Sequence, residues 1–232
     1  MNNSTANRKQ KQLRIALVAF AALLAIQSIW IILPELTRPS PLVFPRELRS
    51  PPISASEREH AKLAAELALV RGDLWAEAAI AQSPESIRSA ESRKTTQSTE
   101  RAQMASAAAE KAAKLSPHDP RIWLLLAYQN CLLNRETSGT LKMSYYTGPN
   151  EIVLTPLRLL IATCSDAIDD AELQTLVARE IRLIVTHEQN LKPAIVTAYQ
   201  NATPSGRRFI EAVVGDLDRG LMATIRANRR TE

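Results

Sequence analysis

The stretch that decides the fold is residues 169–187, DDAELQTLVAREIRLIVTH. Its apolar side chains recur with the 3.6-residue period of an α-helix and form one stripe. They are Leu173, Leu176, Val177, Ile181, Ile184 and Val185. Asp169 and Glu172 stand before the stripe at the spacing of a capping box, with Asp in place of Ser or Thr. The pattern predicts an amphipathic helix that packs one face against a core.

Most other segments of residues 55–232 also carry signals of helices. Residues 116–120 form a break, in which Asp119 is expected to cap the next helix and Pro120 to open it. Residues 122–133, IWLLLAYQNCLL, are apolar on nearly every face and are expected to form the most buried helix of the body. Residues 85–103 are polar and fit either a solvated helix or a connection. No alternating run of β-branched residues predicts a strand, so we expect an all-α fold.

Composition agrees with a helical protein of ordinary size. The 232 residues are 45% apolar, 23% charged and only 4% aromatic, with six Gly and two Cys. These values exclude a disordered chain, a collagen-like repeat and a disulfide scaffold. The length predicts one domain with additional segments.

Residues 15–33, IALVAFAALLAIQSIWIIL, carry no charge and predict a transmembrane helix. Residues 1–14 contain four basic and no acidic side chains, which predicts a cytoplasmic basic tail and places the C-terminal bulk outside the cytoplasm. Trp30 fits an interfacial aromatic anchor, and Pro34 is expected to end the helix. A cleaved secretory signal remains an alternative, although its apolar stretch would be unusually long.

Residues 34–54 are expected to be a Pro-rich linker. Six of the 13 prolines of the chain fall within this range. Such a run favours an extended, semi-rigid spacer that would hold the body away from the bilayer.

Charge is unevenly distributed along the chain. Residues 1–54 carry seven basic and two acidic side chains, whereas residues 55–232 carry 22 of each sign. A nucleic-acid-binding domain needs a cationic face to neutralise phosphates. The balanced body therefore predicts no nucleic-acid partner, and the high isoelectric point reflects the N-terminal segment.

One segment of the body resembles the tetratricopeptide repeat (TPR) family. The resemblance rests on small residues in one helix, a proline after it, and a Trp, Leu and Ala in the next helix. These are Ala105, Ala109, Ala112, Pro117, Trp123, Leu126 and Ala127. It covers residues 105–130, with a fainter echo at 63–78, and departs from the family at 86–99 and at Asn130. The resemblance implies a helical-hairpin solenoid or bundle that binds peptides or proteins in a concave groove.

The sequence predicts no catalytic, cofactor-binding or metal-binding residues. His60, His118 and His187 lie far apart and in no ligand motif. No phosphate-binding Gly-rich loop is present. Tyr145, Tyr146 and Trp123 are candidates to line a sugar or peptide groove, although packing against a neighbouring helix is the commoner use of such rings.

Cys131 and Cys164 are expected on two different helices, 33 residues apart. An oxidising compartment would allow a disulfide between them. Two buried free thiols would fit the same apolar helix faces. The sequence therefore leaves both a disulfide and two free thiols as alternatives.

These features predict a non-catalytic scaffold in the inner membrane of a bacterium, with a periplasmic all-α domain. Its expected partners are the lipid bilayer and envelope proteins, for example in surface polysaccharide assembly. Two alternatives are a glycan- or peptide-binding or processing domain, and a structural subunit of a membrane complex.

Overall fold

The computed structural model describes residues 3–37, 53–83 and 96–229. These residues form α-helices and short 3-10 helices, and no β-strand occurs among them. The fold class is therefore all-α, as predicted. The α-helices are α1 (Asn3–Thr37), α2 (Ala55–Ala68), α3 (Gly72–Gln82), α5 (Thr96–Leu115), α6 (Pro120–Leu132), α7 (Ser138–Thr147), α8 (Thr155–Cys164), α9 (Ala171–Thr186), α10 (Lys192–Asn201), α11 (Pro204–Leu217) and α12 (Arg219–Arg229). The 3-10 helices are η1 (Ile152–Leu154), η2 (Asp166–Asp169) and η3 (Gln189–Leu191).

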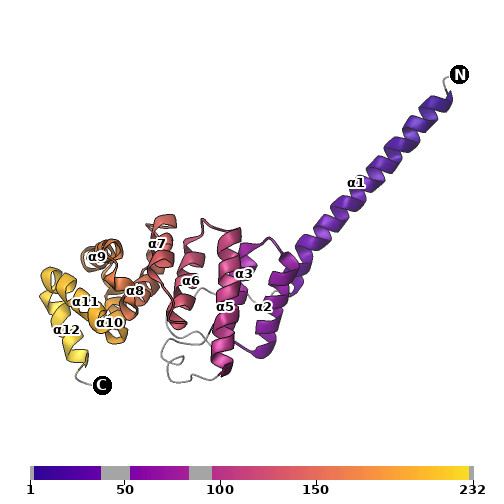
Figure 1. The fold of residues 1–232 in the computed structure, drawn as a ribbon. Helices are drawn as coiled ribbons and strands as arrows, with labels where there is room; N and C mark the ends of the chain where they lie inside the picture. The colour runs from indigo at the N-terminus through magenta and orange to yellow at the C-terminus, as the bar shows by residue number, and fades with distance from the viewer. Residues whose placement is uncertain (1–2, 38–52, 84–95, 230–232) are drawn as a thin grey trace.

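The molecule consists of a long rod and an elongated helical body. Figure 1 shows α1 projecting from one end of the body, α2, α3, α5 and α6 side by side, and α8 to α12 gathered at the other end. Helices α2, α3, α5, α6 and α7 each contact the next of these helices along the chain. We call α2, α3, α5 and α6 the array, and α7 to α12 the C-terminal unit.

Two apolar cores hold the body together. The core of the array is made largely of alanine, with Leu74 and Ile80 among its larger members. The core of the C-terminal unit is made mainly of Leu, Ile, Val and Tyr. Helix α6 belongs to both, because Leu125 lies in the first core and Leu124 in the second. This double packing explains why residues 122–133 are apolar on nearly every face.

Helix α8, not α6, is the most buried helix. Seven consecutive residues, 157–163, are buried, and Thr155 is buried as well. Helices α6, α7, α9, α10 and α11 all contact α8. The expectation for residues 122–133 was wrong because a buried arginine, Arg158, makes α8 look amphipathic in sequence.

The local signals of the sequence predict several helix ends. Asp119 caps α6, with its carboxylate accepting the Arg121 backbone N–H at 2.9 Å, and Pro120 opens the helix. The cap of α9 is Asp170 rather than the expected Asp169, because Asp169 ends the 3-10 turn η2. The Asp170 carboxylate accepts the Leu173 backbone N–H at 2.9 Å.

Two other boundaries differ from expectation or lie outside the described residues. We expected helix α1 to end at Pro34, but it continues through Pro34 to Thr37. The Thr37 hydroxyl donates to the carbonyl oxygen of Pro34 at 3.0 Å, which helps to close this last turn. Residues 38–52 of the expected linker and 85–95 of the polar stretch 85–103 lie outside the described residues, and α5 begins at Thr96.

Candidate functional site

The first candidate site is the junction between α1 and α2. The Trp30 indole N–H donates to the carbonyl oxygen of Leu67 at 3.1 Å. Five residues further along α1, the Glu35 carboxylate pairs with the Arg71 guanidinium at 2.5 Å. Pro34, between them, is buried. The C-terminal end of α1 is therefore attached to the body by an apolar contact, a hydrogen bond and an ion pair.

Arg71 is the polar centre of this junction. It also pairs with Asp73 at 2.6 Å, and the hydrogen bonds that Arg71 donates to Asp73 and then to Glu35 raise its pKa above the usual range. The guanidinium thus bridges the first turn of α3 and the end of α1. Because the three side chains remain partly exposed, solvent screens this bridge, and it orients the junction more than it stabilises it.

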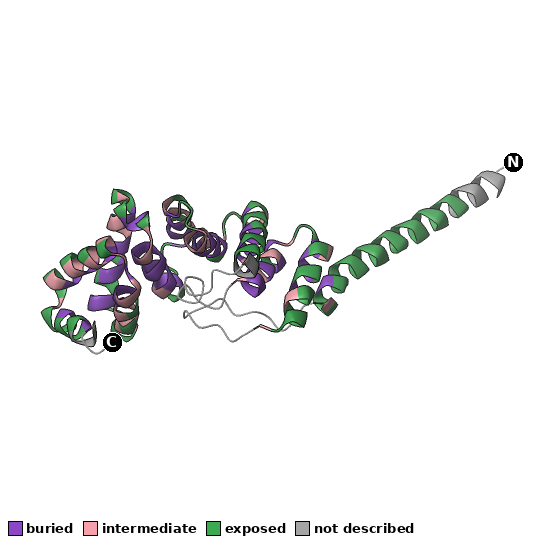
Figure 2. Ribbon diagram, turned by 60° about the horizontal axis from the view of Figure 1, so that its bottom comes forward, coloured by how far each residue is buried: buried purple, intermediate pink, exposed green. Residues whose placement is uncertain are grey.

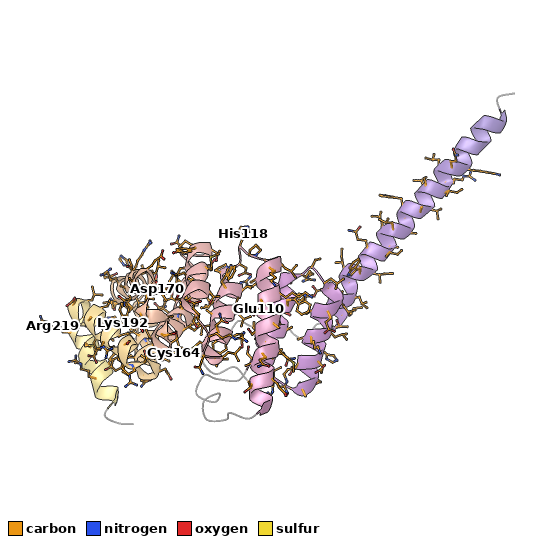
Figure 3. The ribbon with its side chains drawn as sticks, viewed as in Figure 1. Glu110, His118, Cys164, Asp170, Lys192 and Arg219 are labelled. Atoms are coloured by element: carbon orange, nitrogen blue, oxygen red, sulfur yellow. The ribbon has the colours of Figure 1, made fainter. Side chains whose placement is uncertain are left out.

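Away from the junction, α1 is a rod of exposed apolar side chains. Its large apolar residues from Leu13 to Leu36 are each at least 41% exposed. Figure 2 shows this exposure along the rod, and Figure 3 shows side chains pointing outward on all its sides. Within the part of the chain that the structure describes, Lys11–Thr37 is the one segment long and apolar enough to cross a membrane.

The second candidate is a buried polar centre around Arg158 on α8, whose side chain is 1% exposed. Its guanidinium donates to the Ser144 side chain at 3.1 Å and to the carbonyl oxygens of Ser144 and Gly148 at 2.5 and 2.9 Å. It also lies over the Tyr145 ring, 4.7 Å from the centroid. One side chain therefore satisfies the carbonyl groups at the end of α7.

Glu180 on α9 completes this centre. Its carboxylate accepts from the Tyr145 hydroxyl at 2.6 Å and from the Thr155 hydroxyl at 2.8 Å, and lies 3.7 Å from Arg158. Burial raises the pKa of Glu180, against the opposing effects of Tyr145, Arg158 and Thr155. Each carboxylate oxygen has a donor and the side chain is only 10% exposed. The arrangement is a closed ion pair that ties α7, α8 and α9 together.

The three predicted groove residues do not share a groove. Tyr145 is 5% exposed and bonded to Glu180, so its ring cannot line a surface, and that expectation was wrong. Tyr146 is 53% exposed and its hydroxyl donates to Glu172. Trp123 packs against the array core and donates to the Pro117 carbonyl at 2.7 Å. Neighbouring residues on a helix point about 100° apart, which separates the two tyrosines.

Tyr146 belongs instead to a surface cluster that the sequence reasoning missed. Lys142, one turn earlier on α7, pairs with Asp170 at 2.9 Å and with Glu172 at 3.3 Å. Hydrogen bonds from Lys142 lower the pKa of Asp170, and those from Tyr146 and then Lys142 lower the pKa of Glu172. The spacing of Lys142 and Tyr146 was a signal that they share a helix face, but nothing local pointed to α9.

The third candidate is the cysteine pair. Cys131 is the last but one residue of α6, and Cys164 is the last residue of α8. Their sulfur atoms lie 3.6 Å apart, and both side chains are half-buried. Figure 3 shows Cys164 within the body, far from His118 at the turn between α5 and α6. Among the described residues no group of three His, Cys, Asp or Glu side chains could hold a metal ion.

Comparison with known proteins gives no relative: no family model matches the chain, and no similar curated protein or solved structure is found.

Proposed function

We propose that this protein is a single-pass membrane protein whose helical body is a non-catalytic scaffold for protein–protein contact. The observation that carries the proposal is the rod α1, whose apolar side chains are exposed along its length while its C-terminal end is attached to α2. Such a surface is costly in water and is satisfied by a lipid bilayer. Because the end of α1 is attached to α2, the body would be held close to the bilayer that α1 crosses.

The proposed orientation places the N-terminus in the cytoplasm. Arg8, Lys9, Lys11 and Arg14 precede the apolar segment, and no acidic residue accompanies them. Basic flanks are retained on the cytoplasmic side of membrane helices. In the bacterial inner membrane this orientation puts the body in the periplasm, within reach of envelope or surface polysaccharide assembly.

The array supports the scaffold part of the proposal. Its helices contact one another in chain order, and small side chains fill the space between them. At Gly72 an added Cβ would lie 3.1 Å from the Ala112 carbonyl oxygen, so α3 and α5 approach closely. Together with the TPR-like residues 105–130, this arrangement favours a helical-hairpin surface that binds a peptide or protein.

Purification from native membranes tests the scaffold. The full chain is extracted in mild detergent and its partners are identified by mass spectrometry, beside a truncated variant that ends at residue 54. The proposal expects one stoichiometric envelope protein that is lost with the truncation. Recovery of the chain alone, or of the same partner with the truncated variant, contradicts it.

Replacing residues 15–33 by an unrelated transmembrane helix separates a scaffold from a membrane-complex subunit. A scaffold that uses α1 only as an anchor keeps its partner after this exchange. Loss of the partner would show that α1 itself packs in a larger complex.

The proposed compartment also has a chemical consequence for Cys131 and Cys164. Their sulfurs lie 3.6 Å apart, against the ~2.05 Å of a disulfide, so a short approach of the two side chains would join them. We therefore propose that they form a disulfide in the periplasm. Two S–H bonds break and one S–S bond forms, while a disulfide oxidant takes up the two electrons and two protons and leaves as two thiols.

A further inference from the structure

We infer that the turn between α2 and α3 is a second membrane contact, which inserts Leu69 and Val70 into the surface of the bilayer beside α1. The inference rests on the proposal that α1 spans the membrane. It extends that proposal from a helix that anchors the chain to a body that rests on the lipid.

The first observation is the exposure of two consecutive large apolar side chains. Leu69 is 50% exposed and Val70 is 73% exposed, the largest exposure of a large hydrophobic residue in the described body. By contrast, Ala61, Ala64, Ala65 and Ala68 on the preceding turns of α2 are buried. The turn therefore presents its apolar residues outward.

The second observation is the backbone of Leu69, which has φ at +48°. Glycine or asparagine is usual in this region, and a branched residue there is held at a cost in conformational energy. A glycine would form the same turn without the cost. Leucine at this position places an apolar side chain at the tip of the turn. Lipid around the tip would bury this side chain.

The third observation fixes where the turn lies. Leu67 accepts the hydrogen bond from Trp30, and Arg71 pairs with Glu35, so contacts to α1 flank the turn on both sides. Trp30 lies near the end of the apolar segment 15–33, and Glu35 lies two residues beyond it. Figure 1 shows α2 beside this end of α1.

The position of the turn indicates which partner contacts Leu69 and Val70. A bilayer that surrounds α1 ends near Trp30 and Leu33, because indoles and the ends of apolar spans mark the interface. Leu69 and Val70 are held at this height by the two contacts. On α1 itself, Leu33 and Leu36 are 41% and 77% exposed, which adds apolar surface at the same end. The lipid interface is therefore the partner whose chemistry and location both fit.

Site-directed spin labelling of the full chain in lipid nanodiscs tests this contact. Cys131 and Cys164 are replaced by serine, and retained helix content is verified by circular dichroism. Single cysteines then replace Val70, Leu23 on α1, or Leu217 at the far end of the body. Each nitroxide is measured for collisions with oxygen, which partitions into lipid, and with a water-soluble nickel complex.

The inference expects the ratio of oxygen to nickel collisions at Val70 to lie closer to that at Leu23 than to that at Leu217. A lipid-like ratio at Leu23 with a water-like ratio at Val70 would overturn the second contact and leave the anchor intact. A water-like ratio at Leu23 would overturn the anchor, and the second contact with it. Since Val70 is largely exposed, its replacement removes little packing.

Discussion

The array and the C-terminal unit are built from the same kind of helix but are held together differently. Among the described residues, eight of the 13 in the array core are alanines, against four of the 25 in the core of the C-terminal unit. Each buried methylene contributes about 0.8 kcal/mol to stability, so an alanine core gains less per residue than one of leucine and isoleucine. The array is therefore expected to open locally before the C-terminal unit does.

The difference gives each part a separate place in the proposed scaffold. Alanine lets the helices of the array approach closely, and these helices contact one another in chain order. The C-terminal unit has larger side chains and a buried ion pair, and α7, α9, α10 and α11 contact α8. The pair of Cys164 with Cys131 joins this unit to α6 of the array. Four changes test this contrast, and the first removes the polar centre of the C-terminal unit.

Replacing Arg158 by alanine should have the largest effect. It leaves the buried Glu180 carboxylate without its cation and removes one of the donors to the carbonyl oxygens of Ser144 and Gly148, which keep only a backbone N–H each. Removing one partner of a buried pair costs about 3–5 kcal/mol. Urea denaturation of the full chain in detergent measures the loss, and Arg182→Ala, at an exposed position on the neighbouring α9, is the control. Equal midpoints for the two variants would show that the polar centre contributes little.

Breaking the proposed disulfide between Cys131 and Cys164 should cause the next largest loss of stability. A disulfide that closes a loop of this length contributes about 2–4 kcal/mol, or roughly 5–15 °C in Tm. A reductant should therefore lower the Tm of the oxidised full chain. The double variant Cys131→Ser with Cys164→Ser should not respond to the reductant. A response in the double variant, or none in the native chain, would contradict the cross-link.

Close helix contacts give the third test, with two glycines on one helix. At Gly206 an added Cβ would lie 2.2 Å from the Thr163 carbonyl oxygen, whereas at Gly215 it would meet nothing within 4 Å. Gly206→Ala should cost about 1–3 kcal/mol by overpacking, and Gly215→Ala should stabilise α11 by about 0.5–1 kcal/mol.

The array offers a milder version of the same test. An added Cβ at Gly72 would first meet the Ser116 side chain, which can move, so Gly72→Ala should cost less than Gly206→Ala. The reverse order in thermal unfolding would show that the array is packed as tightly as the C-terminal unit.

The surface cluster should give the smallest effect. The pKa values of Asp170 and Glu172 are lowered in the folded chain, so their contribution is present above the unfolded values of 3.8 and 4.5 and is lost as pH falls through the lowered values. Lys142→Ala should lower Tm slightly at neutral pH, and the difference from the native chain should shrink in acid. A difference that grows in acid would contradict this sign.

Local patterns predicted the fold class and several helix ends, because they depend on neighbouring residues. The stripe of α9 is an example, with Leu173 and Ile181 fully buried, and Asp119 is another. The burial of Arg158 and Tyr145 was missed because a charge and a hydroxyl look like surface groups until their partners are known. Those partners, Glu180 above all, are 22 and 35 residues away.

The approach of Cys131 to Cys164 shows the same limit. Each residue had a predicted helix, but only the packing of α6 against α8 brings the sulfurs to 3.6 Å. Similarly, α1 continues through Pro34, which is buried beside the junction with α2 while Leu33 and Leu36 stay exposed. Sequence periodicity carries no information on such long-range contacts.

Protease accessibility in intact bacterial spheroplasts tests the central claim, that α1 crosses the membrane and the body lies outside the cytoplasm. The full chain carries a tag at its N-terminus, and a protease is added before and after the membrane is opened with detergent. The account predicts that external protease digests residues 53–229 while the N-terminal tag stays protected until detergent is added. A body that stays intact until the membrane is opened would contradict it.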